Sequence, residues 1–372
     1  MITGLEKIWK FEVRFDSPNK KHIAILGYLG NDRKINIPKS IYVNYEEINV
    51  TTIEDNAFAD CTDLTSITIP SGVTTIGDGA FSGCSSLASI TIPPSVTSIG
   101  NSAFFNCCNL ASITLPSGLA TIGEEAFYHC SLSSIIIPSS VVAIGDCAFA
   151  DCFELTSVTI PASVTLFGKY VFLNCNHLTE VYISSGITTI GEGAFSGCSS
   201  LASITIPASV TTIGDDAFGG CNNLASITIP ASVTTIGGYV FTNCKNLTSV
   251  TIPSGVTAIG DGAFSGCESL TSITLPSGLT SIGNRAFTDC FELTSITIPA
   301  SVTSVGSSAF CEGSYNVYYD NTGIPSTWKN DWKDEFQGKF YIKSDTMPIS
   351  TPNESNIDGY WHYVNGKPEV LI

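Results

Sequence analysis

The chain carries little positive charge for its length. Its 372 residues contain 16 Lys and Arg against 33 Asp and Glu, so the formal net charge is −17. The shortage is greatest between residues 40 and 328, where Lys169, Lys245 and Arg285 are the only basic residues. An acidic body of this kind repels phosphate backbones, so nucleic acid is excluded as an expected partner.

Long apolar runs and metal-ligating patterns are also missing. No apolar run approaches the roughly 20 residues that a membrane-spanning helix needs, so we expect no membrane insertion. No two carboxylates are placed to face each other for hydrolysis. The spacing of the histidines does not fit a metal site, and we therefore expect no metal, no cofactor and no catalytic residue. The four histidines are His22, His129, His177 and His362.

What the chain does contain is a repeat, marked by twelve phenylalanines. Each lies 23 residues from the next, apart from one 22-residue step from Phe127 to Phe149. A fixed period in this range, with an L-x-x-I-x-I core, indicates a leucine-rich-repeat solenoid of one elongated domain. The twelve are Phe58, Phe81, Phe104, Phe127, Phe149, Phe172, Phe195, Phe218, Phe241, Phe264, Phe287 and Phe310.

One repeat shows how a coil is built. We predict a strand over residues 201–207, because Ile204 and Ile206 alternate with hydroxyl residues and so give one apolar face. Pro207 has no N–H for the neighbouring strand and ends the ladder. A short turn of helix is expected at Ala217–Phe218. Each coil hides its apolar side only against the next coil, so stability depends on neighbours.

Most of the fourteen cysteines share one position in the repeat. We expect these to form an inward-facing ladder of free, buried thiols, because side chains stacked in one direction have poor disulfide geometry. Cys108, Cys147 and Cys311 lie off this ladder, so any redox chemistry is expected at these three and not at the ladder, and their redox state stays open. The ladder consists of Cys61, Cys84, Cys107, Cys130, Cys152, Cys175, Cys198, Cys221, Cys244, Cys267 and Cys290.

The pattern C-x-x-L-x-x-I-x-I-P-x-x-V-x-x-I-G-x-x-A-F, carried by residues 51–310, resembles the BspA-like leucine-rich repeats, a family of bacterial surface antigens. The resemblance implies an α/β leucine-rich-repeat solenoid: a right-handed superhelix with a concave parallel β-sheet, and with short helical turns and irregular segments on the convex side. It also implies a secreted or cell-surface role in adhesion or protein binding. Met1-Ile2-Thr3 begins no signal peptide, so the location rests on the resemblance, and the anchoring mode stays open.

The segments on either side of the repeat are expected to cap it. Towards the C-terminus, residues 358–364 are expected to form a strand that either packs on the cap or belongs to a further module. The predicted organisation is an N-terminal cap with a degenerate first repeat over 1–50, a solenoid of about eleven 22/23-residue repeats over 51–310, a C-terminal cap over 311–342, and a linker with a terminal strand over 343–372.

The solvent face of the predicted sheet is rich in hydroxyl groups, and a few coils depart from this rule. Nine of eleven coils carry only Ser and Thr at the two outward positions, and aromatic residues and histidines gather in the turns of the departing region. Exposed aromatics near a carboxylate are typical of binding hot spots, so we predict a contact patch over 104–182. The alternative is that these coils are merely more divergent copies. The predicted binding residues are Glu180, Tyr182, Ile136, Tyr128, His129, Phe105, Phe153 and His177.

Three functions follow from this picture. The first is an adhesion module that binds proteins of the host extracellular matrix or of a bacterial surface. The second is a carbohydrate-binding module that binds glycans through the hydroxyl face. The third, a polysaccharide-active enzyme, has no supporting residue pattern. The ligand and the oligomeric state stay open.

Overall fold

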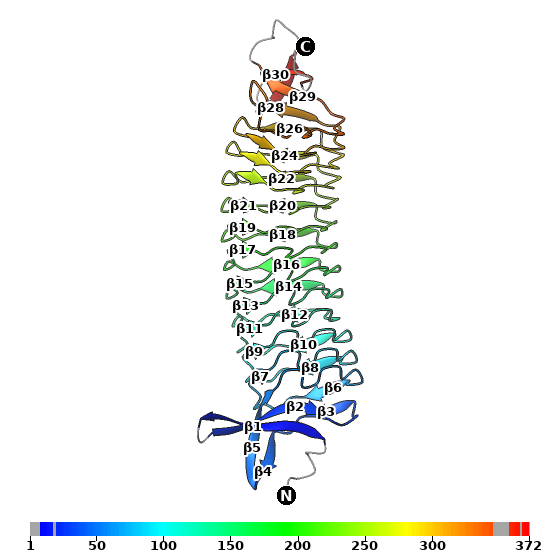
Figure 1. Cartoon of the computed structure of the whole chain (residues 1–372), viewed down its shortest axis with the longest axis vertical. Helices are drawn as coiled ribbons and strands as arrows, with labels where there is room; N and C mark the ends of the chain where they lie inside the picture. Colours follow the sequence, from blue (N-terminus) through cyan, green and yellow to red (C-terminus); the bar gives the residue numbers. More distant parts are fainter. Residues whose placement is uncertain (1–7, 18–19, 345–356, 365–366, 372) are drawn as a thin grey trace. The chain divides into compact units, whose positions relative to one another are not determined.

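The computed structural model describes residues 8–17, 20–344, 357–364 and 367–371. The chain forms two compact units, Met1–Ile187 and Thr188–Ile372. Within each unit, consecutive coils of the chain stack on one another, and most coils add one strand to each of two ladders, along which the hydrogen-bonded pairing is interrupted in places (Figure 1). This is a parallel β-solenoid of leucine-rich-repeat type, so the solenoid prediction is confirmed.

The main ladder is built by the Ser-Ile-Thr segments. Its strands pair in parallel without any offset, so that Ser203 lies opposite Ser226 and Ile204 opposite Ile227. The isoleucine is buried and the two hydroxyl residues face solvent, as the alternation predicts. In the first unit the strands are β3 (Lys34–Asn36), β6 (Ser66–Thr68), β8 (Ser89–Thr91), β10 (Ser112–Thr114), β12 (Ile135–Ile136), β14 (Ser157–Ile160) and β16 (Glu180–Ile183). In the second they are β18 (Ser203–Thr205), β20 (Ser226–Thr228), β22 (Ser249–Thr251), β24 (Ser272–Thr274), β26 (Ser295–Ile298), β28 (Asn316–Tyr319) and β29 (Phe340–Lys343).

A second ladder, of two-residue strands, was not expected from the sequence. It forms because the two residues before the glycine of each coil, most often Thr-Ile, run extended and pair with the corresponding residues of the neighbouring coils. Thr121, for example, pairs with Ser98 and Ala143, and the Ile122 beside it is buried. In the first unit these strands are β7 (Thr75–Ile76), β9 (Ser98–Ile99), β11 (Thr121–Ile122), β13 (Ala143–Ile144) and β15 (Leu166–Phe167). In the second they are β17 (Thr189–Ile190), β19 (Thr212–Ile213), β21 (Thr235–Ile236), β23 (Ala258–Ile259), β25 (Ser281–Ile282) and β27 (Ser304–Val305).

The expected helical turns are wrong, and with them the α/β class. Across the described residues the structure has no helix, and hence none that could cross a membrane. The hydrogen bonds explain this: the N–H groups of Gly79, Phe81 and Gly83 bond to the next coil, whereas those of the residues between them bond three residues back. Gly79 and Gly83 also have φ angles of 61° and 71°. A right-handed α-helix needs negative φ and hydrogen bonds within one segment.

The core of both units is a stack of phenylalanine rings with a ladder of thiols beside it. Neighbouring rings lie 5.2–5.4 Å apart from Phe58 to Phe172 and 5.5–5.8 Å apart from Phe195 to Phe310. At least nine of the eleven ladder thiols donate to a phenylalanine carbonyl of the preceding coil, as Cys107 does to Phe81 at 3.2 Å. All fourteen cysteines are free, and the predicted inward direction is confirmed for ten of the eleven ladder thiols, which are buried.

The N-terminal segment adds longer strands at the first coils. Two antiparallel strands, β1 (Trp9–Ser17) and β2 (Lys20–Tyr28), form in this segment, and β2 pairs in parallel with β5 (Glu46–Ile53). The strand β4 (Ser40–Val43) closes a hairpin with β5. Trp9 lies edge-on to Phe58 at 6.1 Å and so covers the first ring of the stack.

Aromatic residues cover the last coils. Trp332 lies edge-on to Phe310, the last ring of the stack, at 5.8 Å. The strand β30 (Gly359–Val364) pairs with β29, and β31 (Lys367–Leu371) pairs with β30. Trp361 is fully buried and donates its indole N–H to the Tyr319 carbonyl at 3.0 Å. The strand expected over 358–364 is therefore present as β30, and it pairs with β29.

Candidate functional site

Three of the predicted binding residues lie together on the solvent face of the main ladder. In the register of β12, β14 and β16, Ile136 lies opposite Thr159, and Thr159 lies opposite Tyr182. Ile136 is 84% exposed and Tyr182 is 61% exposed. Glu180 is exposed on the same strand and the same face as Tyr182. Ile136, Thr159, Glu180 and Tyr182 are called the sheet-face group below.

A groove runs beside Ile136. It has a volume of about 430 Å³ and lies between β10 and β12, where Ile113, Leu115 and Pro138 line it together with Ile136 and several serines. A similar groove of about 420 Å³ lies between β6 and β8, but there serine and threonine occupy the outward positions. Grooves of this kind therefore recur between neighbouring coils, and Ile136 makes the groove between β10 and β12 more apolar.

Four other predicted residues meet in the turns that precede the main ladder. The rings of Phe105 and Tyr128 stack with their centroids 5.0 Å apart. The His129 ring lies edge-on to Phe153 at 5.7 Å and to Tyr128 at 6.4 Å. Phe153 is 36% exposed, and the other three are half-buried. Phe105, Tyr128, His129 and Phe153 are called the turn cluster below.

Polar neighbours hold the turn cluster in place. A hydrogen bond to the Asp151 carboxylate, together with partial burial, raises the pKa of Tyr128 to about 12. His129 Nδ1 lies 3.0 Å from Asn106 Oδ1 and 3.9 Å from Cys108 Sγ. The His129 backbone has a φ of 54°, in the left-handed region. Tyr128 and His129 are thus fixed by partners in the neighbouring coils.

The eighth predicted residue, His177, lies on the surface beside the turn cluster. Its ring N–H donates to the carbonyl oxygen of Phe153 at 2.7 Å, and Glu154 lies 4.0 Å away. The structure thus brings the eight predicted residues together as two groups, one on the sheet face and one in the turns.

The prediction from sequence missed several neighbours of these groups. Asn106, Cys108, Asp151 and Thr159 all contact or flank predicted residues. The signal that could have found some of them is the period itself: Asn106 precedes His129 by one coil of 23 residues, and Asp151 follows His129 by one coil of 22 residues.

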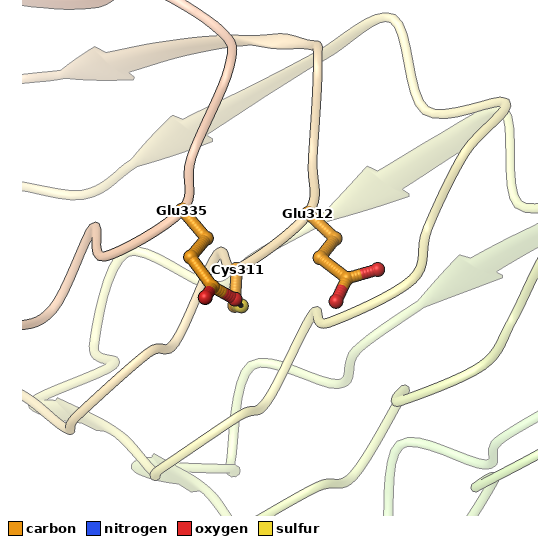
Figure 2. Close-up of side chains that lie close together, drawn as sticks. All are labelled: Cys311, Glu312 and Glu335. Atoms are coloured by element: carbon orange, nitrogen blue, oxygen red, sulfur yellow. Dashed lines mark hydrogen bonds between the residues drawn. The ribbon is translucent and has the colours of Figure 1, made fainter.

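A group that could hold a metal ion lies elsewhere, in the second unit. Figure 2 shows Cys311 and Glu335 with their side-chain ends together and Glu312 beside them, and their ligand atoms all lie within 4.8 Å of one another. The Cys311 thiol donates to Glu335 at 3.3 Å, and burial and this carboxylate raise the pKa of Cys311 to about 11. A hydrogen bond to Asp289 raises the pKa of Glu312. The mixture of a protonated thiol and carboxylates does not identify any one metal.

Comparisons with known proteins identify the repeat. Residues 35–153, 120–248 and 234–329 match the family model described as BspA type leucine rich repeat region, six copies. A search of curated proteins finds no match.

Several solved structures are also similar to the chain. A leucine-rich repeat protein from Bacteroides ovatus is 29% identical with a TM-score of 0.67, and the match covers 90% of this chain and 93% of that one. The leucine-rich repeat protein of T. pallidum is 33% identical with a TM-score of 0.48, covering 52% of this chain and 88% of its own. A leucine-rich cell surface protein from Faecalibacterium prausnitzii is 26% identical with a TM-score of 0.32, covering 71% and 92%. The Bacteroides ovatus structure shares the solenoid fold.

Proposed function

Because the chain belongs to the BspA-type leucine-rich-repeat family, we propose that it is a non-catalytic binding module that contacts other proteins through the face of its main ladder. Its place is outside the cell, secreted or at a bacterial surface, as the family resemblance implies. The partners are proteins of the host extracellular matrix or of a bacterial surface. The proposed organisation keeps residues 1–50 and 311–342 as caps of the repeat.

The sheet-face group is the observation that carries this proposal. Ile136 and Tyr182 expose most of their surface at positions where most other coils hold Ser or Thr. Burying one such side chain in an interface contributes about 1.5–3 kcal/mol. Aromatic residues that become buried in this way are typical of interface hot spots. These two residues add nothing to the core, so contact with a partner gives them a role.

The charge of the chain defines the chemistry of the partner. Residues 40–328 hold three basic and 22 acidic residues, and Glu180 places one carboxylate on the sheet face itself. An acidic surface favours a basic partner through complementary potentials. The partner should therefore present a basic side chain to Glu180 and an apolar side chain to the groove beside Ile136. The turn cluster and His177 form the second part of the proposed contact patch.

A glycan is the second candidate ligand. Aromatic rings beside rows of hydroxyl groups, as Tyr182 lies beside Thr159, suit the apolar and polar faces of a sugar. A glycan would bind weakly and would be displaced by free sugar, whereas a basic protein would be displaced by salt. Competition by sugar or by salt therefore separates the two ligands.

The test is to remove the sheet-face group and then rebuild it elsewhere. The full chain is screened against purified extracellular-matrix proteins, bacterial surface proteins and a glycan array. For the ligand found, we expect I136T/E180S/Y182T to weaken binding by about tenfold or more, since two buried apolar side chains are lost. Equal binding by this variant and the parent would remove the sheet face from consideration.

The second unit offers a matched gain-of-function variant. T205I/S249E/T251Y places Ile, Glu and Tyr on β18 and β22 with Thr228 between them, which copies the arrangement of β12, β14 and β16. Added to the triple variant above, it should restore binding. The conservative pair S226T/T228S on β20 is the control and should leave binding unchanged.

A further inference from the structure

Four of the fourteen cysteines are not fully buried: Cys61, Cys108, Cys147 and Cys311. Three of these lie beside carboxylates. Burial and Asp60 raise the pKa of Cys61, burial and Glu125 raise that of Cys147, and burial and Glu335 raise that of Cys311. A neighbouring negative charge disfavours the thiolate, which is the reactive form of cysteine. These three thiols are therefore poor nucleophiles at neutral pH.

Cys108 has a different neighbour. Its Sγ lies 3.9 Å from Nδ1 of His129 and donates to the Asn106 carbonyl oxygen at 3.4 Å. Asn106 Oδ1 lies 3.0 Å from the same ring nitrogen. With that amide oxygen accepting, the hydrogen on Nδ1 is directed to Asn106, and the ring lies beside the sulfur without donating to it. A protonated histidine ring at this distance stabilises a thiolate through its positive charge.

We propose that Cys108 is a site of thiol–disulfide exchange, at which a low-molecular-weight disulfide forms a mixed disulfide with the folded protein. Cys108 gives up its proton, and the thiolate attacks one sulfur of the small disulfide. The new bond to Cys108 forms as the S–S bond of the small disulfide breaks. The other half leaves as a thiolate and takes up the proton. Cys108 is thereby oxidised, and the departing sulfur is reduced.

The surroundings of Cys108 make the adduct persistent. Its chain neighbour Cys107 is fully buried, and that thiol donates to the Phe81 carbonyl of the preceding coil. Burial raises the pKa of Cys107 to about 12, so it does not supply a second thiolate to displace the adduct. The mixed disulfide therefore stays until an external thiol reduces it.

The adduct also lies against the proposed contact patch. His129 contacts both Cys108 and Phe153, so a bulky group on this sulfur sits beside the turn cluster. If the turn cluster contributes to partner binding, oxidation at Cys108 weakens that binding. This consequence rests on the proposed function, but the exchange reaction itself does not, because it is measured without any partner.

The experiment exposes the folded, reduced full chain to oxidised glutathione near neutral pH and follows the intact mass and the modified peptide. We expect one glutathione per chain, on the peptide that contains Cys108, released again by a reducing thiol. C108S should take up none, and C147S should react as the parent does. H129Q should slow the reaction by about threefold or more and shift its pH profile upwards, since the positioning residue is lost.

An adduct on Cys61, Cys147 or Cys311 in place of Cys108, or no adduct at all, would overturn the proposal. An unchanged rate and pH profile in H129Q would overturn the role of His129. The peptide map of the parent protein needs no variant, so a folding defect in C108S leaves the assignment testable. Partner binding by the glutathionylated chain is measured separately, so a failed adhesion proposal is distinguished from a failed exchange reaction.

Discussion

Two stretches of the solenoid differ in their surfaces and agree in their interiors. In coils 203–274 of the second unit, the outward positions of β18, β20, β22 and β24 hold only Ser and Thr. In coils 104–182 of the first unit, Ile136, Glu180 and Tyr182 replace them, and aromatic rings fill the turns. Yet both stretches keep the phenylalanine stack and the thiol-to-carbonyl bonds. The core fixes the coil, and the surface varies independently of it.

The variation is not confined to one side of the first unit. Val142 and Leu166 are exposed on or beside the second ladder of the same coils, away from the face of the main ladder. A single partner on the sheet face does not explain these two residues. Divergence of the copies accounts for them, so the contact proposal concerns the sheet-face group and the turn cluster and not every unusual residue of the region.

The largest expected effect is alkaline unfolding, and it should affect both stretches alike. Burial raises the pKa of Cys107, Cys152 and Cys267 to about 12, whereas an unfolded thiol ionises near 8.5. The folded pKa is the higher one, so the stabilisation is complete below the unfolded pKa and is lost as pH rises towards the folded one. Each such thiol should cost about 1.4 kcal/mol per pH unit in that window.

Urea unfolding followed by circular dichroism from neutral pH to pH about 10 measures this loss, which adds over the whole thiol ladder. Replacing ladder cysteines by alanine gives the control, because each replacement should flatten the pH dependence while lowering stability at neutral pH. A midpoint that stays constant up to pH about 10 would show that the thiols ionise equally well in the folded chain.

The next effect tests whether the interiors are equivalent. Phe127→Ala in the first unit and Phe241→Ala in the second each remove a fully buried ring from the stack. Both should lower the free energy of unfolding by about 3–5 kcal/mol, through lost burial and the cavity left behind. Denaturant titration of the two variants checks this. A large cost for one and a negligible cost for the other would break the claim that a common core underlies different surfaces.

The smallest expected effect concerns the surface itself. Ile136→Thr restores the hydroxyl residue of the other coils at a position that is 84% exposed. Its free energy of unfolding should stay within about 0.5 kcal/mol of the parent, since the side chain makes little contact with the core. Thr228→Ser at the corresponding position of β20 serves as the control in the same titration. A marked loss of stability in I136T would mean that this isoleucine stabilises the fold, which would argue against a role in binding a partner.

The sequence predicted well how one coil is built and which of its side chains face inward, and there is a physical reason for this. The period of 23 residues places identical side chains in register, so the inward Phe, Cys and Ile and the outward Ser and Thr follow from alternation alone. The second ladder and the absence of helix did not follow. Positions with positive φ hold Gly or Asn in several coils but Glu125, Tyr170 or Arg285 in others, which hides the turn signal.

The candidate site was predicted in part. Which residues depart from the repeat is visible in the sequence, and the outward direction of Ile136, Glu180 and Tyr182 follows from strand alternation. Their grouping depends on contacts between coils, such as His129 with Asn106 and Cys108, which a reading of one coil at a time does not show. These contacts join residues that lie about one repeat apart in the sequence, so the grouping depends on how neighbouring coils stack.

The bond from a ladder thiol to a phenylalanine carbonyl spans 26 residues in most of the coils that make it, so it joins a coil only to its immediate predecessor. A segment of 23 residues can therefore be inserted or removed as a unit, and the two new neighbours form the same bond. The stretch GAFSGCSSLASITIP, present at 79–93 and again at 193–207, offers matching ends for such an exchange. Recombination between copies can thus change how far the molecule reaches while leaving every junction intact.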